Sequence, residues 1–309
     1  MSADKRLTKA YRGAVVKEFD EKSKFVIFSD CHRGDDSASD EFARNETIIL
    51  HALRYYYEND YTYIEAGDGD ELWEHGTFHY IRAAHMNVLL EMKKFFDDNR
   101  FYMLYGNHNN YLKNQHFVQR NYYYYYDEYS ERYVKLFYKI KPIESLVLKE
   151  RNTGQEILVV HGHQGDILND QLWLLAMFGV RYIWRYLRLV GIRNPSSPAR
   201  NQNRRHKMER KYGKWLKENP VMLICGHTHR MKFPKKNEWP YFNIGCCVHS
   251  KGVTVIEIEN NKIALVQWSV LAAKSGELCI TRNILRGPEP IQWWNRYSSI
   301  KWKNKIFTK

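Results

Sequence analysis

The stretch KFVIFSDCH, residues 24–32, decides how the rest of the chain is interpreted. Residues 24–29 form a short apolar run that predicts a buried strand, and Asp30 and His32 follow it directly. The same order, a β-rich run and then polar side chains, occurs four more times. The four runs are residues 61–66, 101–105, 156–160 and 221–225. Because α/β sheets carry their sites at strand ends, we expect the five ends to build one site.

Helical stretches lie between the first three strands and predict right-handed crossovers of a largely parallel sheet. They cover residues 40–58 and 83–98. Three further strand-like runs come after residue 240 and suggest a second, antiparallel-rich sheet packed on the first. The runs are residues 241–245, 252–259 and 262–270. Asn260 and Asn261 separate the last two runs, so they predict a hairpin turn.

Two regions depart from this strand and helix pattern. Residues 167–219 contain a Trp- and Leu-rich helix, a Pro/Ser break and a basic helix, and we interpret them as a helical cap inserted between two sheet strands. Residues 281–309 read as a basic, aromatic tail. We therefore expect one domain over residues 1–309 with an inserted cap and a C-terminal tail.

Composition bounds the class of protein. A hydrophobic fraction of 44% with 27% charged residues is typical of a globular chain with a real core. Lys and Arg outnumber Asp and Glu by 48 to 35, a net charge of +13, which favours anionic partners. The five cysteines follow no disulfide pattern, and neither a signal peptide nor a transmembrane stretch is evident. We expect a cytoplasmic protein.

All five strand ends carry side chains that bind metals. The clusters are Asp30 with His32, Asp68, Asn107 with His108, His161 with His163, and His227 with His229. One such pair means little, since polar side chains commonly end strands, but five in series are hard to attribute to chance. Carboxylate, amide and imidazole together suit Mn²⁺, Fe²⁺ or Zn²⁺ rather than Ca²⁺. We expect two divalent ions, with Mn²⁺ first among the candidates.

The order of these motifs resembles the calcineurin-like metallophosphoesterase superfamily over roughly residues 25–230. The expected fold is α/β, a four-layer α-β-β-α sandwich of two packed mixed sheets with an inserted helical cap. The resemblance also implies a reaction in which a hydroxide held between two cations attacks phosphorus in line. It requires no covalent enzyme intermediate.

The resemblance assigns a role to each motif residue. It implies that Asp68 bridges two metals and that His108 protonates the leaving oxygen, with Glu71 positioned to orient His108. The remaining ligands divide between the metals, with Asp30, His32 and His229 on the first and Asn107, His161 and His227 on the second. The family has Asp or Glu where this chain has Asn109, so the support of His108 differs here.

Neighbouring residues keep two interpretations each. His163 either supports the ligand His161 or is solvated, and Arg33 either contacts substrate or belongs to a polar loop. Cys31 and Cys225 sit inside metal motifs, but strand alternation turns them away from the ligands and predicts packing. The tyrosines of residues 122–126 receive no role.

One branch of the superfamily is closest in pattern. The sequence GDGDELW, residues 67–73, and the position of the inserted cap are similar to the UDP-2,3-diacylglucosamine pyrophosphatases of lipid A synthesis. That branch carries Arg where this chain has His108. The cap helix places Arg181, Arg185 and Arg188 on one stripe, either to meet acyl chains and phosphates or to lie solvated on a packed helix.

The sequence thus favours a metal-dependent hydrolase of a phosphoester or pyrophosphate bond in a phosphorylated small-molecule or lipid-linked substrate. Peripheral contact with the inner membrane face would accompany a lipid substrate. A nuclease, a cyclic-nucleotide phosphodiesterase or a protein phosphatase are the enzyme alternatives, since the charge of +13 also suits nucleic acid. The non-enzyme alternative is a nucleic-acid or membrane binding module with a vestigial metal site.

Overall fold

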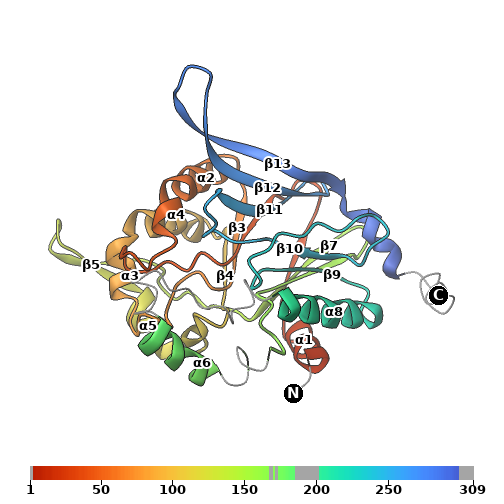
Figure 1. Cartoon of the computed structure of the whole chain (residues 1–309), viewed down its shortest axis with the longest axis horizontal. Coiled ribbons are helices and arrows are strands. Elements are labelled where there is room, and N and C mark those ends of the chain that lie inside the picture. Colours follow the sequence, from red (N-terminus) through yellow and green to blue (C-terminus); the bar gives the residue numbers. More distant parts are fainter. Residues whose placement is uncertain (1–2, 167–169, 171–172, 185–201, 299–309) are drawn as a thin grey trace.

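The structure, a computed structural model, describes residues 3–166, 170, 173–184 and 202–298. Two β-sheets lie face to face, and helices cover the outer face of each (Figure 1). This four-layer arrangement confirms the fold class that the sequence predicts. Within the described residues, every helix is too short or too polar to cross a membrane.

The first sheet has six strands in the order β13-β12-β11-β2-β3-β4. Its strands are β2 (Phe25–Phe28), β3 (Thr62–Ala66), β4 (Phe101–Leu104), β11 (Val253–Glu259), β12 (Lys262–Ala272) and β13 (Leu278–Pro290). The strands β2, β3 and β4 are parallel, as predicted, whereas β11 runs antiparallel to β2 with Ile256 opposite Ile27. Asn260 and Asn261 form the predicted β11–β12 turn.

The second sheet has five strands in the order β1-β7-β8-β9-β10. They are β1 (Val15–Phe19), β7 (Ser145–Glu150), β8 (Glu156–Val160), β9 (Met222–Cys225) and β10 (Tyr241–Asn243). The sequence groups β8 and β9 with β2, β3 and β4, and groups β10 with β11 and β12 in a second sheet. In the structure β8, β9 and β10 share one sheet, whereas β11 and β12 join β2 in the other, so both groupings are wrong. Chain order does not reveal which sheet a strand joins, because strands of both sheets, such as β2 and β9, are buried on both faces.

Strand β2 shows why these runs are apolar throughout. Phe25 and Ile27 point into the core between the sheets, where they meet strands of the other sheet, and Val26 and Phe28 point to the helices outside. All four side chains are buried. The helices on that side are α2 (Glu46–Glu58) and α4 (Met86–Asp97), with the short η1 (Ala43–Asn45) and α3 (His79–Ala84) before them.

The other sheet is covered by α1 (Ala3–Arg12) and α8 (Gln202–Glu218). Tyr212 and Trp215 of α8 are buried against this sheet, so α8 belongs to the outer helical layer. The second helix of the predicted cap, residues 167–219, therefore packs on this sheet. Because α8 alternates Lys and Arg with Met208, Tyr212 and Trp215, its basic composition concealed an apolar stripe.

The first helix of the predicted cap does lie apart from the sheets. It comprises α6 (Trp173–Gly179) and the π-helical turn η4 (Val180–Trp184), and residues 185–201 lie outside the described residues. Tyr111 of η2 (Asn110–Lys113) contacts this helix, donating from its hydroxyl to Met177 Sδ at 3.1 Å. The helix thus sits beside the Asn107 and His108 loop.

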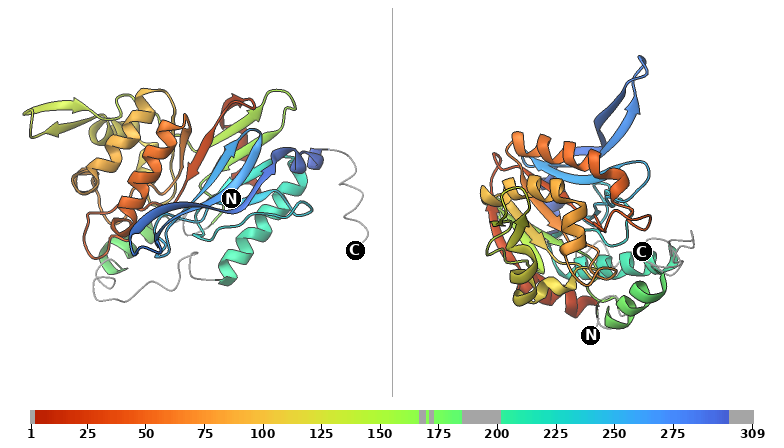
Figure 2. Two further views of the ribbon diagram at one scale, coloured as in Figure 1. Left: turned by 90° about the horizontal axis from the view of Figure 1, so that it is seen from above. Right: turned by 90° about the vertical axis from the view of Figure 1, so that its left-hand side faces the viewer.

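Two β-arms extend from the body (Figure 2). One is the hairpin of β5 (Tyr124–Asp127) and β6 (Arg132–Lys135), which follows α5 (Gln115–Tyr122). The tyrosine run therefore ends a helix and begins a strand. The other arm is the tip of β12 and β13. The predicted tail of residues 281–309 begins inside β13, and Trp294 of η5 (Ile291–Ser298) is buried between the sheets, so its described part is packed.

Candidate metal centre

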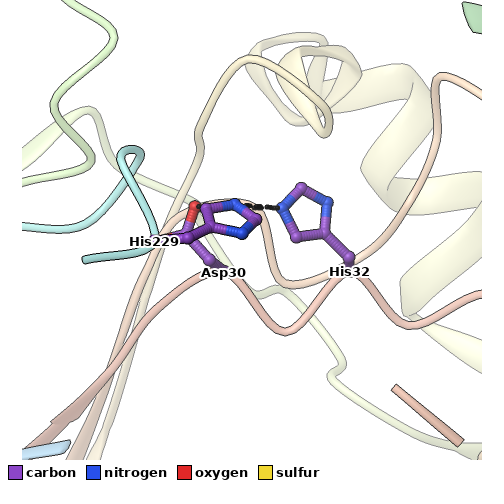
Figure 3. A group of neighbouring side chains, drawn as sticks. All are labelled: Asp30, His32 and His229. Carbon is purple, nitrogen blue, oxygen red and sulfur yellow. Dashed lines mark hydrogen bonds and ion pairs between the residues drawn. The ribbon is translucent and has the colours of Figure 1, made fainter. Parts of the chain in front are cut away.

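The seven predicted ligands come from loops at the ends of β2, β3, β4, β8 and β9. Six of them form two groups whose ligand atoms lie within 4.8 Å of one another: Asp30, His32 and His229, and Asp68, His161 and His227. In the first group, His229 Nε2 lies 3.2 Å from Asp30 Oδ1 and 3.2 Å from His32 Nε2 (Figure 3). Two ring nitrogens that face each other beside a carboxylate form a suitable cradle for a cation.

The second group adjoins the first. His161 Nε2 lies 3.0 Å from Asp68 Oδ2 and 3.2 Å from Asn107 Oδ1, the seventh predicted ligand. The same Asp68 oxygen is 4.0 Å from His32 Nε2. Asp68, a member of the second group, therefore also faces the first group.

The backbone at this centre adopts a conformation that L-residues rarely tolerate. Positive φ angles occur at five of the predicted ligands: Asp30 (54°), His32 (50°), Asp68 (50°), His227 (65°) and His229 (52°). Each such residue costs on the order of 1 kcal/mol, and such outliers concentrate at functional sites. This conformation turns the side chains of three loops, those after β2, β3 and β9, toward one another.

Two motif glycines let these loops approach one another. A Cβ on Gly106 would lie 2.1 Å from Asp68 Oδ1, and one on Gly226 would lie 2.2 Å from Asp30 Oδ2. Both distances are far below van der Waals contact. The glycines therefore leave room for the two carboxylates rather than for a tight turn.

The donor set fits divalent cations. Asp30 is buried, and its Oδ1 receives no well-aligned hydrogen bond from the described residues, although His229 Nε2 and His32 Nε2 lie 3.2 and 3.8 Å away. A buried carboxylate oxygen without a donor is expensive unless a cation binds it. A mixed set of carboxylate, amide and imidazole ligands suits transition-metal ions.

Electrostatics keep the two carboxylates charged. Burial by itself would raise the pKa of Asp30, but the imidazoles of His229 and His161 hold it well below its usual value. Burial would likewise raise the pKa of Asp68, but His161 outweighs this effect and the pKa is lowered. In the reverse sense, burial would lower the pKa of His229, yet Asp30 raises it to about 10. Positive charge is what these carboxylates require, and a divalent cation supplies more of it.

His108 and Glu71, the predicted leaving-group acid and its orienting partner, are in direct contact. His108 Nδ1 lies 2.7 Å from Glu71 Oε1, and the other Glu71 oxygen lies 2.8 Å from His32 Nδ1. Asn109 instead accepts the backbone N–H of Gly106 through Oδ1 at 2.6 Å. Glu71 thus gives His108 the carboxylate that Asn109 does not.

Arg33 does not reach the substrate side of the loop. Its guanidinium is buried and donates to Glu65 Oε1 at 2.6 Å, to Glu65 Oε2 at 3.0 Å and to Asp70 Oδ1 at 2.7 Å. The hydroxyl of Tyr122 donates to the other Asp70 oxygen at 2.7 Å. The network ties the loop after β2 to the loop after β3.

The other residues of the motifs are buried. His163 is 1% exposed with its ring 5.5 Å from that of His161, which excludes the solvated interpretation. Cys31 and Cys225 pack in apolar clusters, and burial raises the pKa of the Cys225 thiol to about 12, so it stays protonated. Sequence reasoning missed Asp166, whose Oδ2 lies 3.5 Å from His227 Nε2.

Among the three cap arginines, only Arg181 lies in the described residues, and Arg185 and Arg188 fall outside them. The Arg181 guanidinium binds protein backbone: Nε donates to the carbonyl of Trp73 and Nη2 to that of Leu72, each at 2.9 Å. Trp73, the last residue of the GDGDELW motif, to which the sequence assigned no role, stacks on His108 with ring centroids 4.1 Å apart.

The family model of the calcineurin-like phosphoesterases matches residues 23–231. The chain belongs to this family. It is accordingly a metallophosphoesterase, and its family supports a metal-dependent hydrolysis of phosphoesters by divalent ions held at the clusters described above. Among curated proteins, none matches the sequence.

Several solved structures are distantly similar. The cold-active protein-tyrosine phosphatase of a psychrophile, Shewanella sp., is 14% identical over 89% of this chain and 84% of its own, with a TM-score of 0.38. A single mutant of Vps29 from Entamoeba histolytica is 14% identical over 85% and 99%, with a TM-score of 0.33. GAP50, the anchor in the inner membrane complex of Plasmodium, is 11% identical over 87% and 90%, with a TM-score of 0.43.

Proposed function

We propose that this metallophosphoesterase uses two Mn²⁺ ions to hydrolyse a phosphoester or pyrophosphate bond in an amphiphilic or nucleotide-linked substrate. The observation that carries the proposal is the arrangement of Asp68 between two separate ligand groups. One group alone would suit a single cation. Two adjacent groups suit a pair, because Asp68 of the second group also lies 4.0 Å from His32 of the first and could bridge both ions.

The proposed roles follow the geometry. Asp30, His32 and His229 would hold one ion, Asn107, His161 and His227 the other, and Asp68 both. Bound cations would supply an acidified water as nucleophile and positive charge for the phosphoryl oxygens. His108 would donate its proton to the leaving oxygen from the ring edge opposite Glu71, because Glu71 occupies Nδ1 and leaves Nε2 for the substrate.

An acylated nucleotide-sugar pyrophosphate is the substrate class we propose to test first. The cap helix exposes three large apolar side chains, each of them more than half exposed: Leu174 and Phe178 of α6 and Tyr182 of η4. The ring of Phe178 stacks on that of Tyr182. This exposed apolar stripe, together with the GDGDELW motif, supports an amphiphilic substrate and peripheral membrane contact from the cytoplasmic side. The net charge of +13 favours anionic nucleic acid as the second candidate.

The test is a hydrolysis screen in Mn²⁺ and in EDTA with a diacylated UDP-sugar, nucleotide pyrophosphates, cyclic nucleotides and single-stranded DNA. We expect Mn²⁺-dependent turnover of the acylated pyrophosphate. Asp68→Asn should lower it by at least about 100-fold, more than the loss of a residue that merely supports a ligand. Exposed Asp97, replaced by Asn, is the matched control.

Other outcomes decide between the alternatives. Turnover of nucleotides or DNA alone keeps the metal centre and rejects the lipid substrate. Unaltered activity in Asp68→Asn contradicts the site assignment. Steeply salt-dependent binding of DNA or vesicles without any turnover favours a binding module with a vestigial site.

A further inference from the structure

The turn of residues 72–74 lies between the metal centre and the cap helix. Trp73 is 2% exposed and lies in this turn, two residues after Glu71. Its indole is nearly parallel to the His108 imidazole, at an interplanar angle of 24°. His108 is thus fixed at two places, by Glu71 at Nδ1 and by Trp73 on one ring face. A stacked ring limits rotation about the histidine side chain without using a ring nitrogen.

Arg181 holds this turn from the side of the cap. Its guanidinium donates hydrogen bonds to two successive carbonyl groups, those of Leu72 and Trp73, at 2.9 Å each. In the described part of the chain, no backbone N–H donates to either carbonyl. A rigid guanidinium fork matches two neighbouring acceptors in a way that a lysine ammonium does not.

The space around the guanidinium is also limited. Leu72 and Trp73 are both buried, so water has little access to their side of the turn. A Cβ on Gly76 would lie 3.5 Å from Arg181 Nη1, which places the following loop segment against the same group. Arg181 is therefore built into the turn and is not a free surface cation.

We propose that Arg181 is a positioning residue for His108, because it holds the turn that keeps Trp73 stacked on the imidazole. The inference rests on the proposed function, in which His108 protonates the leaving oxygen. It reassigns Arg181, first considered as a substrate contact. It also links the cap helix to the leaving-group step, since displacement of η4 would release the turn and then His108.

A kinetic experiment separates positioning from general damage. The probes are 4-nitrophenyl phenylphosphonate, whose leaving group needs no proton, and benzyl phenylphosphonate, whose alkoxide does. We expect Arg181→Met and Trp73→Leu to lower kcat on the benzyl ester at least about ten-fold more than on the 4-nitrophenyl ester. Trp73→Phe keeps a stacked ring and should recover most of the difference.

The matched control is Arg210→Met in α8. This substitution removes the same charge at an exposed position, where Arg210 Nε donates to the His206 carbonyl of its own helix. This variant should show the wild-type ratio of the two rates. Equal losses on both esters in Arg181→Met would overturn the proposal, since loss of metal or of folding affects both reactions alike.

A spectroscopic measurement decides the contact without any turnover. In Zn²⁺-loaded protein with ¹³C-labelled histidine, ring current from Trp73 should move the His108 Hε1 resonance upfield, with the resonance assigned from His108→Gln. Arg181→Met and Trp73→Leu should both remove the upfield shift, and Arg210→Met should keep it. An unchanged resonance in Arg181→Met would refute the proposal that Arg181 keeps Trp73 stacked on His108. If the wild-type protein is inactive, only the proposed function is contradicted, because the resonance still reports whether Arg181 keeps Trp73 stacked on His108.

Discussion

Asp40 organises the loop that follows the Asp30 and His32 pair. Its carboxylate accepts hydrogen bonds from the backbone N–H groups of Gly34 at 3.1 Å and Asp36 at 3.0 Å, and it lies 2.7 Å from His85 Nε2. Burial would raise the pKa of Asp40, but His85 and the backbone donors lower it below its usual value. The ionised carboxylate therefore stabilises the folded state.

Replacing this carboxylate should weaken the protein in a pH-dependent way. Asp40→Asn should lower the free energy of unfolding by roughly 1–3 kcal/mol at neutral pH, because buried donors lose their charged acceptor. Since the folded-state pKa is depressed, that stability is present above the ordinary Asp pKa of about 3.9 and is lost as the pH falls through the folded value. Urea unfolding of both proteins from pH 7 to pH 3 measures it. A difference that stays constant with pH contradicts the assignment.

Residue identity also explains what sequence reasoning could and could not find at the site. Each predicted ligand follows an apolar run in a recognisable pattern, so the structure brings together side chains that the pattern already named. The role of Trp73 was not predicted, and Asp166 was missed, because their contacts are with His108 and His227, which lie far away along the chain. A lone Asp in a loop carries no spacing signal of its own.

The β11–β12 turn is a local feature that the sequence predicts well. Asn260 and Asn261 have φ angles of 51° and 54°, a left-handed conformation that asparagine tolerates better than most residues. Asn260→Ala with Asn261→Ala should therefore cost about 1 kcal/mol per residue in the free energy of unfolding. Asn261→Gly, which adopts positive φ freely, should be neutral or stabilising. Urea titration of the two variants makes the comparison, and equal stabilities would contradict it.

The buried Arg33 network joins the loops after β2 and β3. Arg33→Met should lower the free energy of unfolding by about 3–5 kcal/mol, because Glu65 and Asp70 would remain buried without their cation. The matched control is Arg54→Met on α2, whose partner is Glu91 and whose side chain is 58% exposed. That exposed pair should contribute about 0–1 kcal/mol. Chemical denaturation at neutral pH tests both, and losses of similar size would refute the role of burial.

Strand membership was the part of the fold that local sequence could not decide. Strand β8 and strand β3 read alike, since each has five residues of which all but the first are buried, yet they belong to different sheets. Strand β8 pairs with β9 and strand β3 pairs with β2. These pairings depend on packing across the core between the sheets, which local sequence does not encode. The basic surface of α8 likewise suggested a cap until Trp215 and Tyr212 were seen against the second sheet.

The metal centre draws on both sheets of the molecule. Asp30, His32, Asp68 and Asn107 follow strands of the six-stranded sheet, whereas His161, His227 and His229 follow strands of the five-stranded sheet. Cations at the centre would therefore join the two halves of the sandwich. Chelation should loosen the whole domain as well as stop the proposed reaction.

Thermal unfolding measures this link. Mn²⁺ at 100 times its dissociation constant should stabilise the folded protein by about 2.7 kcal/mol, so the unfolding midpoint should rise relative to EDTA. Asp68→Asn should abolish most of the rise, whereas Asp97→Asn, at an exposed helix position, should keep it. A midpoint that does not respond to Mn²⁺ in the unaltered protein contradicts binding at the predicted ligands.

The interleaved strand order has a consequence for how the chain acquires its structure during synthesis. Strand β2 lies between β3, which is made soon after it, and β11, where Ile256 pairs with Ile27. Strand β1 cannot pair until β7 has been synthesised, because Val16 pairs with Val147. The five-stranded sheet cannot be completed until β10 (Tyr241–Asn243) has left the ribosome, and the six-stranded sheet requires β13, which ends at Pro290. Apolar strand edges are exposed to other nascent chains for that interval, so the protein should depend on chaperones and fold slowly.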